Sequence, residues 1–266
     1  MREATEDKDT IRQTKGSWLD SPGIAFSMYS RFPVPQVQWT EAGMKYAICF
    51  FPLVGVAVGG CVAVFAFLAR YFSMGGIGFA GFGTALPILL TGGIHMDGFL
   101  DTVDARSSCQ SRERKLEILK DPHTGAFAII GCGVYLLLYV SAFSGLGEGA
   151  FPAVLAVYVM PRALSGWALV GFPKAKREGL ASTFARQASD QAVEWCMAGW
   201  FCLAAGFLAV TAGILAGCCM TVVALVIFWW YHHMAMKEFG GITGDLAGYF
   251  LQLAELGMVA VLAGFC

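Results

Sequence analysis

Gly76-Ile-Gly-Phe-Ala-Gly-Phe-Gly-Thr-Ala-Leu-Pro-Ile-Leu-Leu-Thr-Gly-Gly-Ile94 is an apolar stretch close to the length of a membrane span, and a group of carboxylates follows it directly. About 20 apolar residues are enough for a helix to cross the hydrocarbon core of a bilayer. The whole chain has the same character, since 57% of its 266 residues are hydrophobic and 14% are charged. Soluble domains have about 25% charged residues. The sequence therefore predicts an all-α, polytopic integral membrane protein that folds as a helical bundle.

Six further apolar stretches approach the spanning length, so we expect about seven transmembrane helices. The fifth and sixth spans are the least distinct, because only Ala216-Gly-Cys-Cys219 separates them. We interpret residues 1–16 as a polar cytoplasmic tail and residues 17–266 as one transmembrane catalytic domain. The seven predicted spans are Tyr46–Leu68, Gly76–Ile94, Gly125–Gly145, Phe151–Phe172, Trp195–Leu215, Met220–His232 and Leu246–Cys266.

Lysine and arginine alternate between the segments that separate these spans. The segment before the first span holds six, and the loops after the second and fourth spans hold five and four. The remaining segments hold one or none. The positive-inside rule therefore predicts a cytoplasmic N-terminus, with site loops at about 95–124, 174–194 and 233–245 on the cytoplasmic side. The net charge of −1 gives no electrostatic reason to expect nucleic-acid binding.

The segment Thr91–Asp104 contains three aspartates whose spacing indicates a metal site. Asp97, Asp101 and Asp104 are separated by four and three residues, which places them on one face of a helix. Their mutual repulsion becomes favourable when a divalent cation binds, and Mg²⁺ in proteins is held by carboxylates together with substrate phosphates. The simpler interpretation is a solvated helix end.

Asp121 and His123 follow a short charged segment, in Asp121-Pro-His-Thr-Gly125. Pro122 disfavours helix at the residue before it, so an ordered turn is expected. Asp121 could complete a two-metal clamp for phosphoryl transfer, or it could simply form the turn. His123 and His95 are candidate phosphate contacts or acid–base groups, and each could equally be an interfacial histidine.

Arg162 lies near the middle of the fourth apolar stretch, directly after Pro161. An arginine at membrane depth costs at least about 2.5–3.5 kcal/mol on insertion scales, which indicates that it faces a polar cavity. Pro161 could break the helix there and free carbonyl groups into that cavity. The alternative is an arginine that reaches an interface or pairs with a carboxylate for structural reasons.

Three other segments carry groups that suit phosphate or a cation. Phe239-Gly-Gly-Ile-Thr-Gly-Asp245 precedes the last span and offers backbone N–H groups, the Thr243 hydroxyl and the Asp245 carboxylate. Arg31 lies in Tyr29-Ser-Arg-Phe-Pro-Val-Pro35 and could reach a phosphate or a lipid headgroup. The cluster Lys174-Ala-Lys-Arg-Glu-Gly179 could contact substrate or anchor the fourth span.

Together these segments resemble the cobalamin synthase family, the adenosylcobinamide-GDP ribazoletransferases. The His-x-Asp-Gly-x-x-Asp-Thr-x-Asp block is the most specific part of the resemblance. Ala181 and Phe99-Leu100 depart from the usual pattern without removing a functional group. The matching segments are Ser30–Pro35, Phe51–Gly55, Thr91–Asp104, Ile118–Asp121 with Gly125, Arg177–Leu180 and Gly240–Asp245.

The resemblance implies an Mg²⁺-dependent phosphotransferase of the bacterial or archaeal inner membrane, with its active site facing the cytoplasm. Its substrates would be adenosylcobinamide-GDP and α-ribazole or α-ribazole 5′-phosphate. The products would be adenosylcobalamin, or its 5′-phosphate, and GMP. A homo-oligomer and association with other cobamide-assembly enzymes are compatible with it.

The resemblance also suggests roles for individual residues. The metal ligands would be the three aspartates of Thr91–Asp104 together with Asp121. His123, His95 or a metal-bound aspartate would accept the proton from the attacking hydroxyl group. The substrate-binding residues would be Arg31, His95, Lys120, Arg162, Arg177, Thr243 and Asp245.

Two other functions compete with this one. A membrane phosphotransferase of the CDP-alcohol type would also place aspartates on a helix at the membrane boundary, although with two intervals of four residues. A cation or corrinoid transporter would use acidic residues and Arg162 as a pathway, but it should carry carboxylates at mid-membrane depth in more than one span. The preferred lower-ligand base, the phosphorylation state of the acceptor and the oligomeric state are not determined by the sequence.

Overall fold

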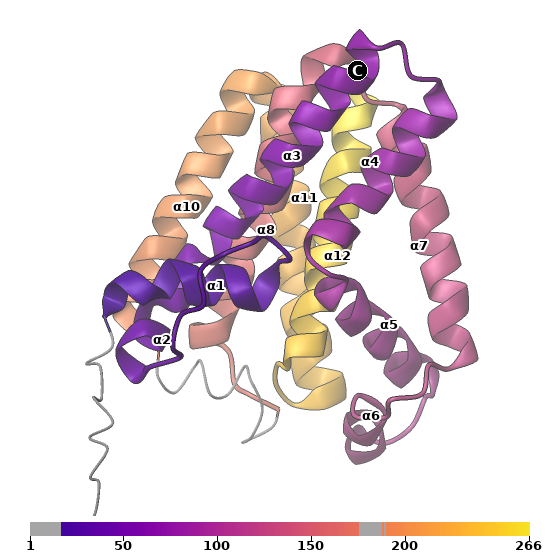
Figure 1. Cartoon of the computed structure of the whole chain (residues 1–266). Coiled ribbons are helices and arrows are strands. Elements are labelled where there is room, and N and C mark those ends of the chain that lie inside the picture. The colour runs from indigo at the N-terminus through magenta and orange to yellow at the C-terminus, as the bar shows by residue number, and fades with distance from the viewer. Residues whose placement is uncertain (1–16, 176–187, 189) are drawn as a thin grey trace, which may run out of the picture.

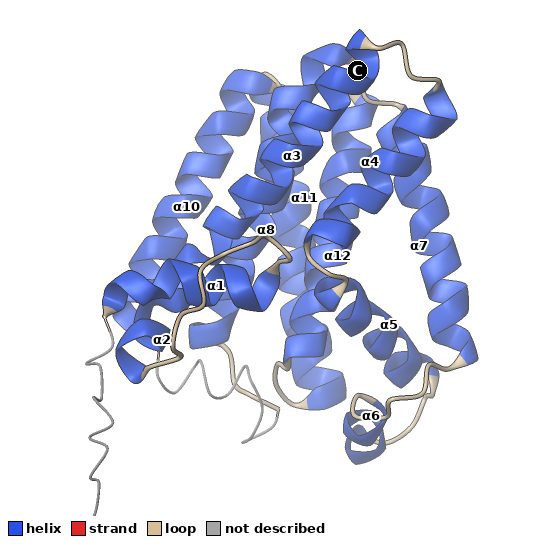
Figure 2. Cartoon of the chain, viewed as in Figure 1, coloured by secondary structure: helices blue, strands red, loops and turns tan. Residues whose placement is uncertain are grey.

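The computed structural model describes residues 17–175, 188 and 190–266. Within these residues every regular element is a helix, and a single bridge pair between Lys174 and Ile242 is the one β-type contact (Figure 2). The helices form a bundle with several short helices at one end (Figure 1). The predicted all-α class is confirmed.

Six helical segments are long and apolar enough to cross a membrane, and a bent helix pair brings the total to as many as seven. This agrees with the predicted number of spans. The side of the membrane on which the N-terminus lies stays a prediction. The six segments contain the helices α3 (Phe51–Tyr71), α7 (Ala126–Ser144), α8 (Phe151–Gly171), α10 (Asp190–Thr211), α11 (Ile214–Met234) and α12 (Gly244–Gly264).

The bent pair differs from the straight span predicted for Gly76–Ile94. Helix α4 (Gly76–Leu90) ends early, and α5 (Ile94–Ser107) leaves it at 96°. Gly92 and Gly93 between them have φ angles of 66° and 79°, which side chains with a Cβ atom rarely adopt. The two glycines therefore turn the acidic segment sideways across the bundle.

The boundary between the fifth and sixth spans was predicted in the wrong place. The chain turns at Ala212 and Gly213, where Gly213 has a φ of 86°, and α11 continues through the segment Ala216–Cys219. Within that segment Gly217 packs closely on α10, since a methyl group there would lie 2.8 Å from the backbone nitrogen of Ala209. The small residues at 216–219 thus serve helix packing rather than a turn.

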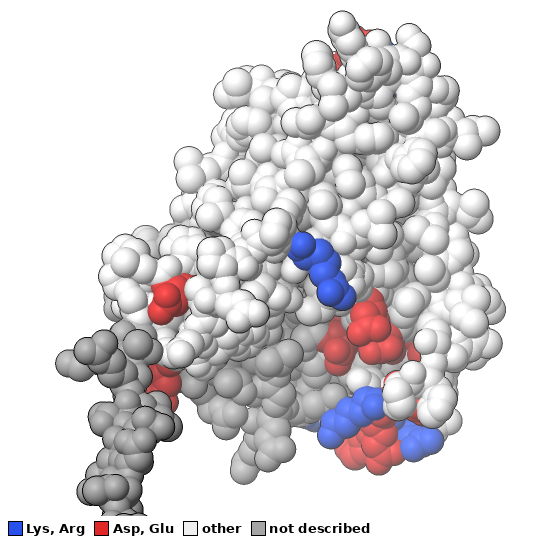
Figure 3. Space-filling view, in the orientation of Figure 1, with Lys and Arg blue, Asp and Glu red and all other residues white. Residues whose placement is uncertain are grey.

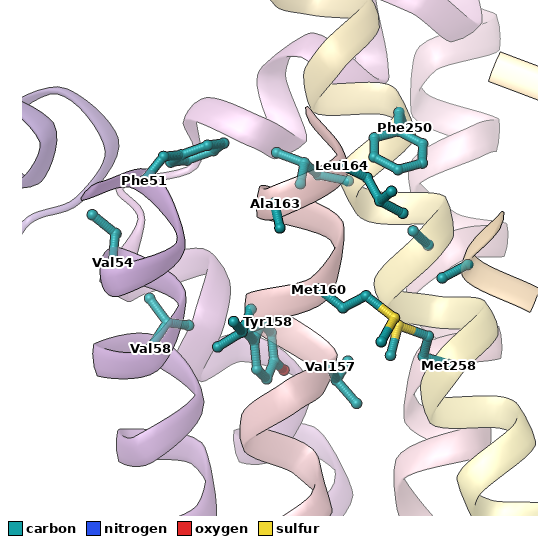
Figure 4. Packing of buried hydrophobic residues seen from close by; sticks show 14 of the residues in the cluster. Phe51, Val54, Val58, Val157, Tyr158, Met160, Ala163, Leu164, Phe250 and Met258 are labelled. Carbon is teal, nitrogen blue, oxygen red and sulfur yellow. The ribbon is translucent and has the colours of Figure 1, made fainter. Parts of the chain in front are cut away.

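Helix α8 is the centre of the bundle. Of its apolar 18-residue stretch 83% is buried, compared with 22% of the corresponding stretch of α10. The predicted break at Pro161 is wrong, because α8 runs through Pro161 without interruption. Gly55 of α3 lets the two backbones approach, since a methyl group there would lie 2.3 Å from the Tyr158 carbonyl oxygen. Figure 4 shows apolar side chains of α3 and α12 packed on either side of those of α8.

The short helices gather at the end of the bundle from which α3, α7, α10 and α12 start (Figure 1). They belong to the segments that the charge pattern assigns to one compartment. The loops 72–75, 145–147 and 212–213 lie at the opposite end with the C-terminus (Figure 1). The short elements here are α1 (Ser21–Tyr29), α2 (Glu41–Ala47), α6 (Arg112–Ile118), the 3-10 turns η1 (Trp18–Asp20) and η2 (Ile48–Phe50), and a π-helical turn, η4 (Ala235–Phe239).

Candidate active site at the charged end of the bundle

The charged end is built on close contact between α5 and the start of α12. A methyl group at Gly98 would lie 2.7 Å from the carbonyl oxygen of Asp245, and one at Gly248 would lie 2.8 Å from the carbonyl oxygen of His95. Backbones can approach this closely only where side chains are absent. The acidic helix and the glycine-rich loop before α12, remote in sequence, therefore lie side by side.

Two of the predicted aspartates lie one turn apart on α5 and differ in exposure. Asp97 is exposed in the first turn of the helix, and Asp101 is half-buried one turn later. Figure 3 shows acidic side chains collected over α5 and α6, with basic side chains nearby, while the upper half of this face is almost free of charge. The i, i+4 spacing places Asp97 and Asp101 on one helical face. The prediction placed Asp104 on that face as well, as a third metal ligand, and that part of it stays a prediction.

Arg31 lies beside the bend between α4 and α5. Its backbone N–H donates to the carbonyl oxygen of Leu90 at 2.8 Å. Its side chain covers Gly92, where a methyl group would lie 2.5 Å from the Arg31 Nε. The structure therefore brings an exposed guanidinium to the helix end that carries Asp97.

Asp104 faces a different neighbour. Its two carboxylate oxygens accept the backbone N–H groups of Gly125 at 2.5 Å and of Ala128 at 2.9 Å. These are N–H groups at the start of α7 that have no partner within their own helix. Asp104 therefore acts as a side-chain cap for α7, a role that the spacing of the aspartates did not reveal.

Asp121 and His123 form the ordered turn expected from Pro122. The Asp121 carboxylate accepts the backbone N–H of His123 at 3.0 Å and contacts its Nδ1 at 2.7 Å. Both hydrogen bonds favour the ionised carboxylate, the backbone one more strongly, and they hold the pKa of Asp121 below its ordinary value. Both side chains are largely exposed, and the adjacent Lys120 is exposed as well.

The loop Gly240–Thr243 leads into α12. Its Thr243 hydroxyl accepts the N–H of Leu246 at 3.2 Å, as an N-cap does, and donates to Asp245 at 3.3 Å. Ile242 pairs with the segment after α8, donating its N–H to the Pro173 carbonyl oxygen at 2.8 Å. The loop is thus held by α12 through Thr243 and by the segment after α8 through Ile242.

Arg162 and His95 lie inside the bundle. Arg162 is 1% exposed and its Nη1 donates to the Glu255 carboxylate and to the Tyr158 carbonyl oxygen, both at 2.7 Å. Its Nη2 is 3.5 Å from the His95 Nδ1. Glu255 was not among the predicted site residues. The signal that could have found it is a carboxylate in the middle of the last apolar span, opposite an arginine in the fourth.

A second group of residues missed by the sequence analysis fastens α6 to the bundle. Glu238 of η4 pairs with Arg106 at 3.1 Å and with Lys115 at 2.7 Å. Arg106 also donates to the Tyr249 hydroxyl at 2.9 Å. No sequence motif signals this group, because its members come from four separate elements. The predicted residue Arg177 lies outside the described residues.

The described residues contain no group of three or more His, Cys, Asp or Glu side chains arranged to hold a metal ion by themselves. Mg²⁺ does not require such a group, because it is usually bound by one or two carboxylates together with substrate phosphates and water. On α5, the exposed Asp97 and the half-buried Asp101 offer carboxylate oxygens for this. Their oxygen chemistry fits Mg²⁺ bound jointly by protein and substrate.

Comparison with known proteins places this arrangement in a family. The model of the family described as cobalamin-5-phosphate synthase matches residues 22–263, which include every element of the charged end described above.

The chain belongs to the cobalamin-5-phosphate synthase family.

Relatives within the family carry one name. An adenosylcobinamide-GDP ribazoletransferase of Lachnoclostridium phytofermentans is 46% identical over 92% of this chain and 95% of its own length. Proteins of the same name from Desulfitobacterium hafniense and Geobacillus kaustophilus are 33% and 29% identical, over 88% and 92% of this chain and 92% and 94% of their own lengths. No solved structure matches the chain.

Proposed function

We propose that this protein joins adenosylcobinamide-GDP to α-ribazole or its 5′-phosphate, as an adenosylcobinamide-GDP ribazoletransferase. The observation that carries the proposal is the family match over residues 22–263, because it spans α5, α6 and the loop before α12 together. The reaction site is the charged end of the bundle. By the positive-inside rule this end faces the cytoplasm of a bacterial or archaeal inner membrane.

In the proposed reaction, the ribose 3′-hydroxyl of α-ribazole attacks the phosphorus bonded to cobinamide. A new P–O bond forms, the bond from that phosphorus to the bridging oxygen breaks, and GMP leaves with the bridging oxygen. The hydroxyl proton passes to a base. Transfer of this kind depends mainly on alignment and on neutralisation of phosphate charge.

Asp97 and Asp101 would hold Mg²⁺, which when bound neutralises charge on the diphosphate. Arg31, placed at the bend beside α5, would bind a phosphate oxygen through its exposed guanidinium. A guanidinium is well suited to this role because its N–H groups can donate to two oxygens at once. The start of α12, with Thr243 and Asp245, would position the substrate from the other side.

The two candidate histidines differ in their access to a substrate. His95 is 4% exposed and lies against Arg162. The His123 side chain is 88% exposed and is oriented by Asp121. A general base must reach the proton that it accepts. We therefore assign that role to His123 or to a carboxylate of α5, in preference to His95.

Purified full-length protein in detergent provides the test. With adenosylcobinamide-GDP, α-ribazole and MgCl₂ it should release GMP, and omission of either substrate or chelation of Mg²⁺ should stop the release. Release of CMP from a CDP-alcohol in place of this reaction would support the rival phosphotransferase. Transport of a divalent cation by vesicles that contain the protein, without GMP release, would support the transporter.

A further inference from the structure

An ion pair in the interior of the bundle joins α8 to α12. Arg162 Nη1 is 2.7 Å from Glu255 Oε1, and the two side chains are 1% and 4% exposed. Neither can contact a substrate at the surface. Arg162 also lies over the ring of Phe51, with its Cζ 5.7 Å from the ring centroid, so the guanidinium is enclosed by α3 as well.

The same guanidinium reaches the first turn of α5. Its Nη2 is 3.5 Å from Nδ1 of His95, two residues before Asp97. The His95 ring is held on another side by Tyr29 and Phe51, whose ring centroids lie 6.3 and 5.9 Å away. An uninterrupted series of contacts therefore leads from Glu255 through Arg162 to the turn that presents Asp97.

Stability alone does not account for this cluster. Burying two charges costs more than their attraction returns in many proteins, and well-packed apolar side chains of the same volume are often as stabilising or more so. Two nitrogens of the cluster, Arg162 Nε and His95 Nε2, are buried and have no hydrogen-bond partner among the described residues. Buried polar groups destabilise a fold where they lack a partner, so a structural role alone would favour apolar side chains here.

A small cavity adjoins the cluster. It is lined by Arg162, His95 and Glu255 together with residues of α4, α7 and α12, and it leaves about 10 Å³ for the centre of a water molecule. This is close to the lower limit for one bound water. The cluster is therefore not packed as an apolar core is, and its geometry depends on the polar contacts themselves.

We propose that Glu255 and Arg162 are positioning residues for the acidic face of α5. Glu255 fixes the guanidinium, the guanidinium fixes His95, and His95 sets the direction of the first turn of α5 and so the place of Asp97. The inference rests on the proposed function, since Asp97 is taken there as a metal ligand. It differs from the predicted direct contact of Arg162 with substrate.

Two variants and one control test the proposal in the full-length protein. Glu255→Gln keeps the size of the side chain but removes the charge that orients Arg162. Arg162→Lys keeps a cation for Glu255 but has one nitrogen in place of the two that reach Glu255 and His95. Tyr139→Phe is the control, because it removes a buried hydrogen bond between α7 and α8, 2.7 Å to the Tyr158 hydroxyl, and keeps the Tyr158 carbonyl oxygen that Arg162 contacts.

We expect both cluster variants to lower kcat by about 10- to 100-fold per folded molecule, the range seen when partners that orient metal ligands are removed. The KM values should change less, because the variants touch no substrate. Hydrogen–deuterium exchange of the amides 94–100 should become faster in both variants. Tyr139→Phe should leave kcat and this exchange close to wild type, even where it lowers the melting temperature.

Three results would overturn the positioning role. The first is a wild-type kcat in Arg162→Lys, which would show that Glu255 needs only a positive charge beside it and that the contact with His95 is not needed. The second is unchanged exchange of α5 in both variants. The third is a loss of activity that follows only the amount of folded protein. If the wild-type protein releases no GMP, the proposed function fails, and the exchange measurement still decides whether the cluster positions α5.

Discussion

The carboxylate of Asp104 accepts the backbone N–H of Gly125 at 2.5 Å, and so ties the last turn of α5 to the start of α7. A second hydrogen bond, from Ala128 at 2.9 Å, uses the other oxygen. The three aspartates of Thr91–Asp104 therefore have unequal surroundings: Asp97 is exposed, Asp101 and Asp104 are half-buried, and Asp104 caps a helix. This difference can be measured.

Asp104→Ala should lower the free energy of unfolding by about 0.5–2 kcal/mol, because two N–H groups of α7 lose their acceptor. Asp97→Ala should change it much less, since Asp97 is exposed. Thermal denaturation of both variants in the same detergent gives the comparison. Equal stability of the two would contradict a capping role for Asp104.

Asp97→Asn should reduce turnover by at least about 100-fold while the protein stays folded. The substitution removes the charge of a proposed metal ligand, and even the outer partners of such ligands are worth 10- to 100-fold. GMP release per folded molecule is the measurement. Glu113→Gln, which neutralises another exposed carboxylate at the same end of the bundle, is the control and should retain wild-type turnover. Similar turnover of the two variants would argue strongly against the assignment.

Gly98→Ala should separate α5 from α12. The added methyl group would lie 2.7 Å from the Asp245 carbonyl oxygen and 2.8 Å from its Cα, and backbone atoms cannot give way as a flexible side chain can. Overpacking of this kind costs about 1–3 kcal/mol, and we expect turnover to fall with it. In Gly133→Ala of α7 the added methyl group has no atom of the described residues within 4 Å, and the variant should be harmless. If both variants were equally active and stable, the close contact between α5 and α12 at Gly98 would not be needed for activity.

Glu238→Gln should loosen α6. It weakens hydrogen bonds to Lys115 and Arg106, whose side chains are 11% and 29% exposed. Hydrogen bonds to charged groups contribute about 1.5–3 kcal/mol. Glu117→Gln breaks a pair with Arg114 in which both side chains are more than 60% exposed, and it should cost at most about 1 kcal/mol. Exchange of the amides 112–118 and the melting temperature would show the contrast, and a larger effect of Glu117→Gln would refute it.

Much of the bundle could be predicted because each spanning helix must be apolar over its own length, whatever its neighbours are. A helix that crosses a bilayer satisfies its own backbone groups, so apolar length alone identifies a span. The failures occurred where local geometry overrides length. Gly92 and Gly93 turn the chain through 96° after α4. The turn between α10 and α11 lies at Gly213, although the small residues at 216–219 suggested a turn there.

By itself, then, the sequence determined the class, the approximate number of spans, the carboxylate spacing and the family resemblance. All of these depend on the order of residues along one segment. The tertiary structure decided which groups meet: Asp104 with α7, Arg31 with Gly92, and Arg162 with Glu255. Such contacts join residues up to 93 positions apart. Their formation depends on how closely whole helices pack, and that packing is set by small residues on several helices together.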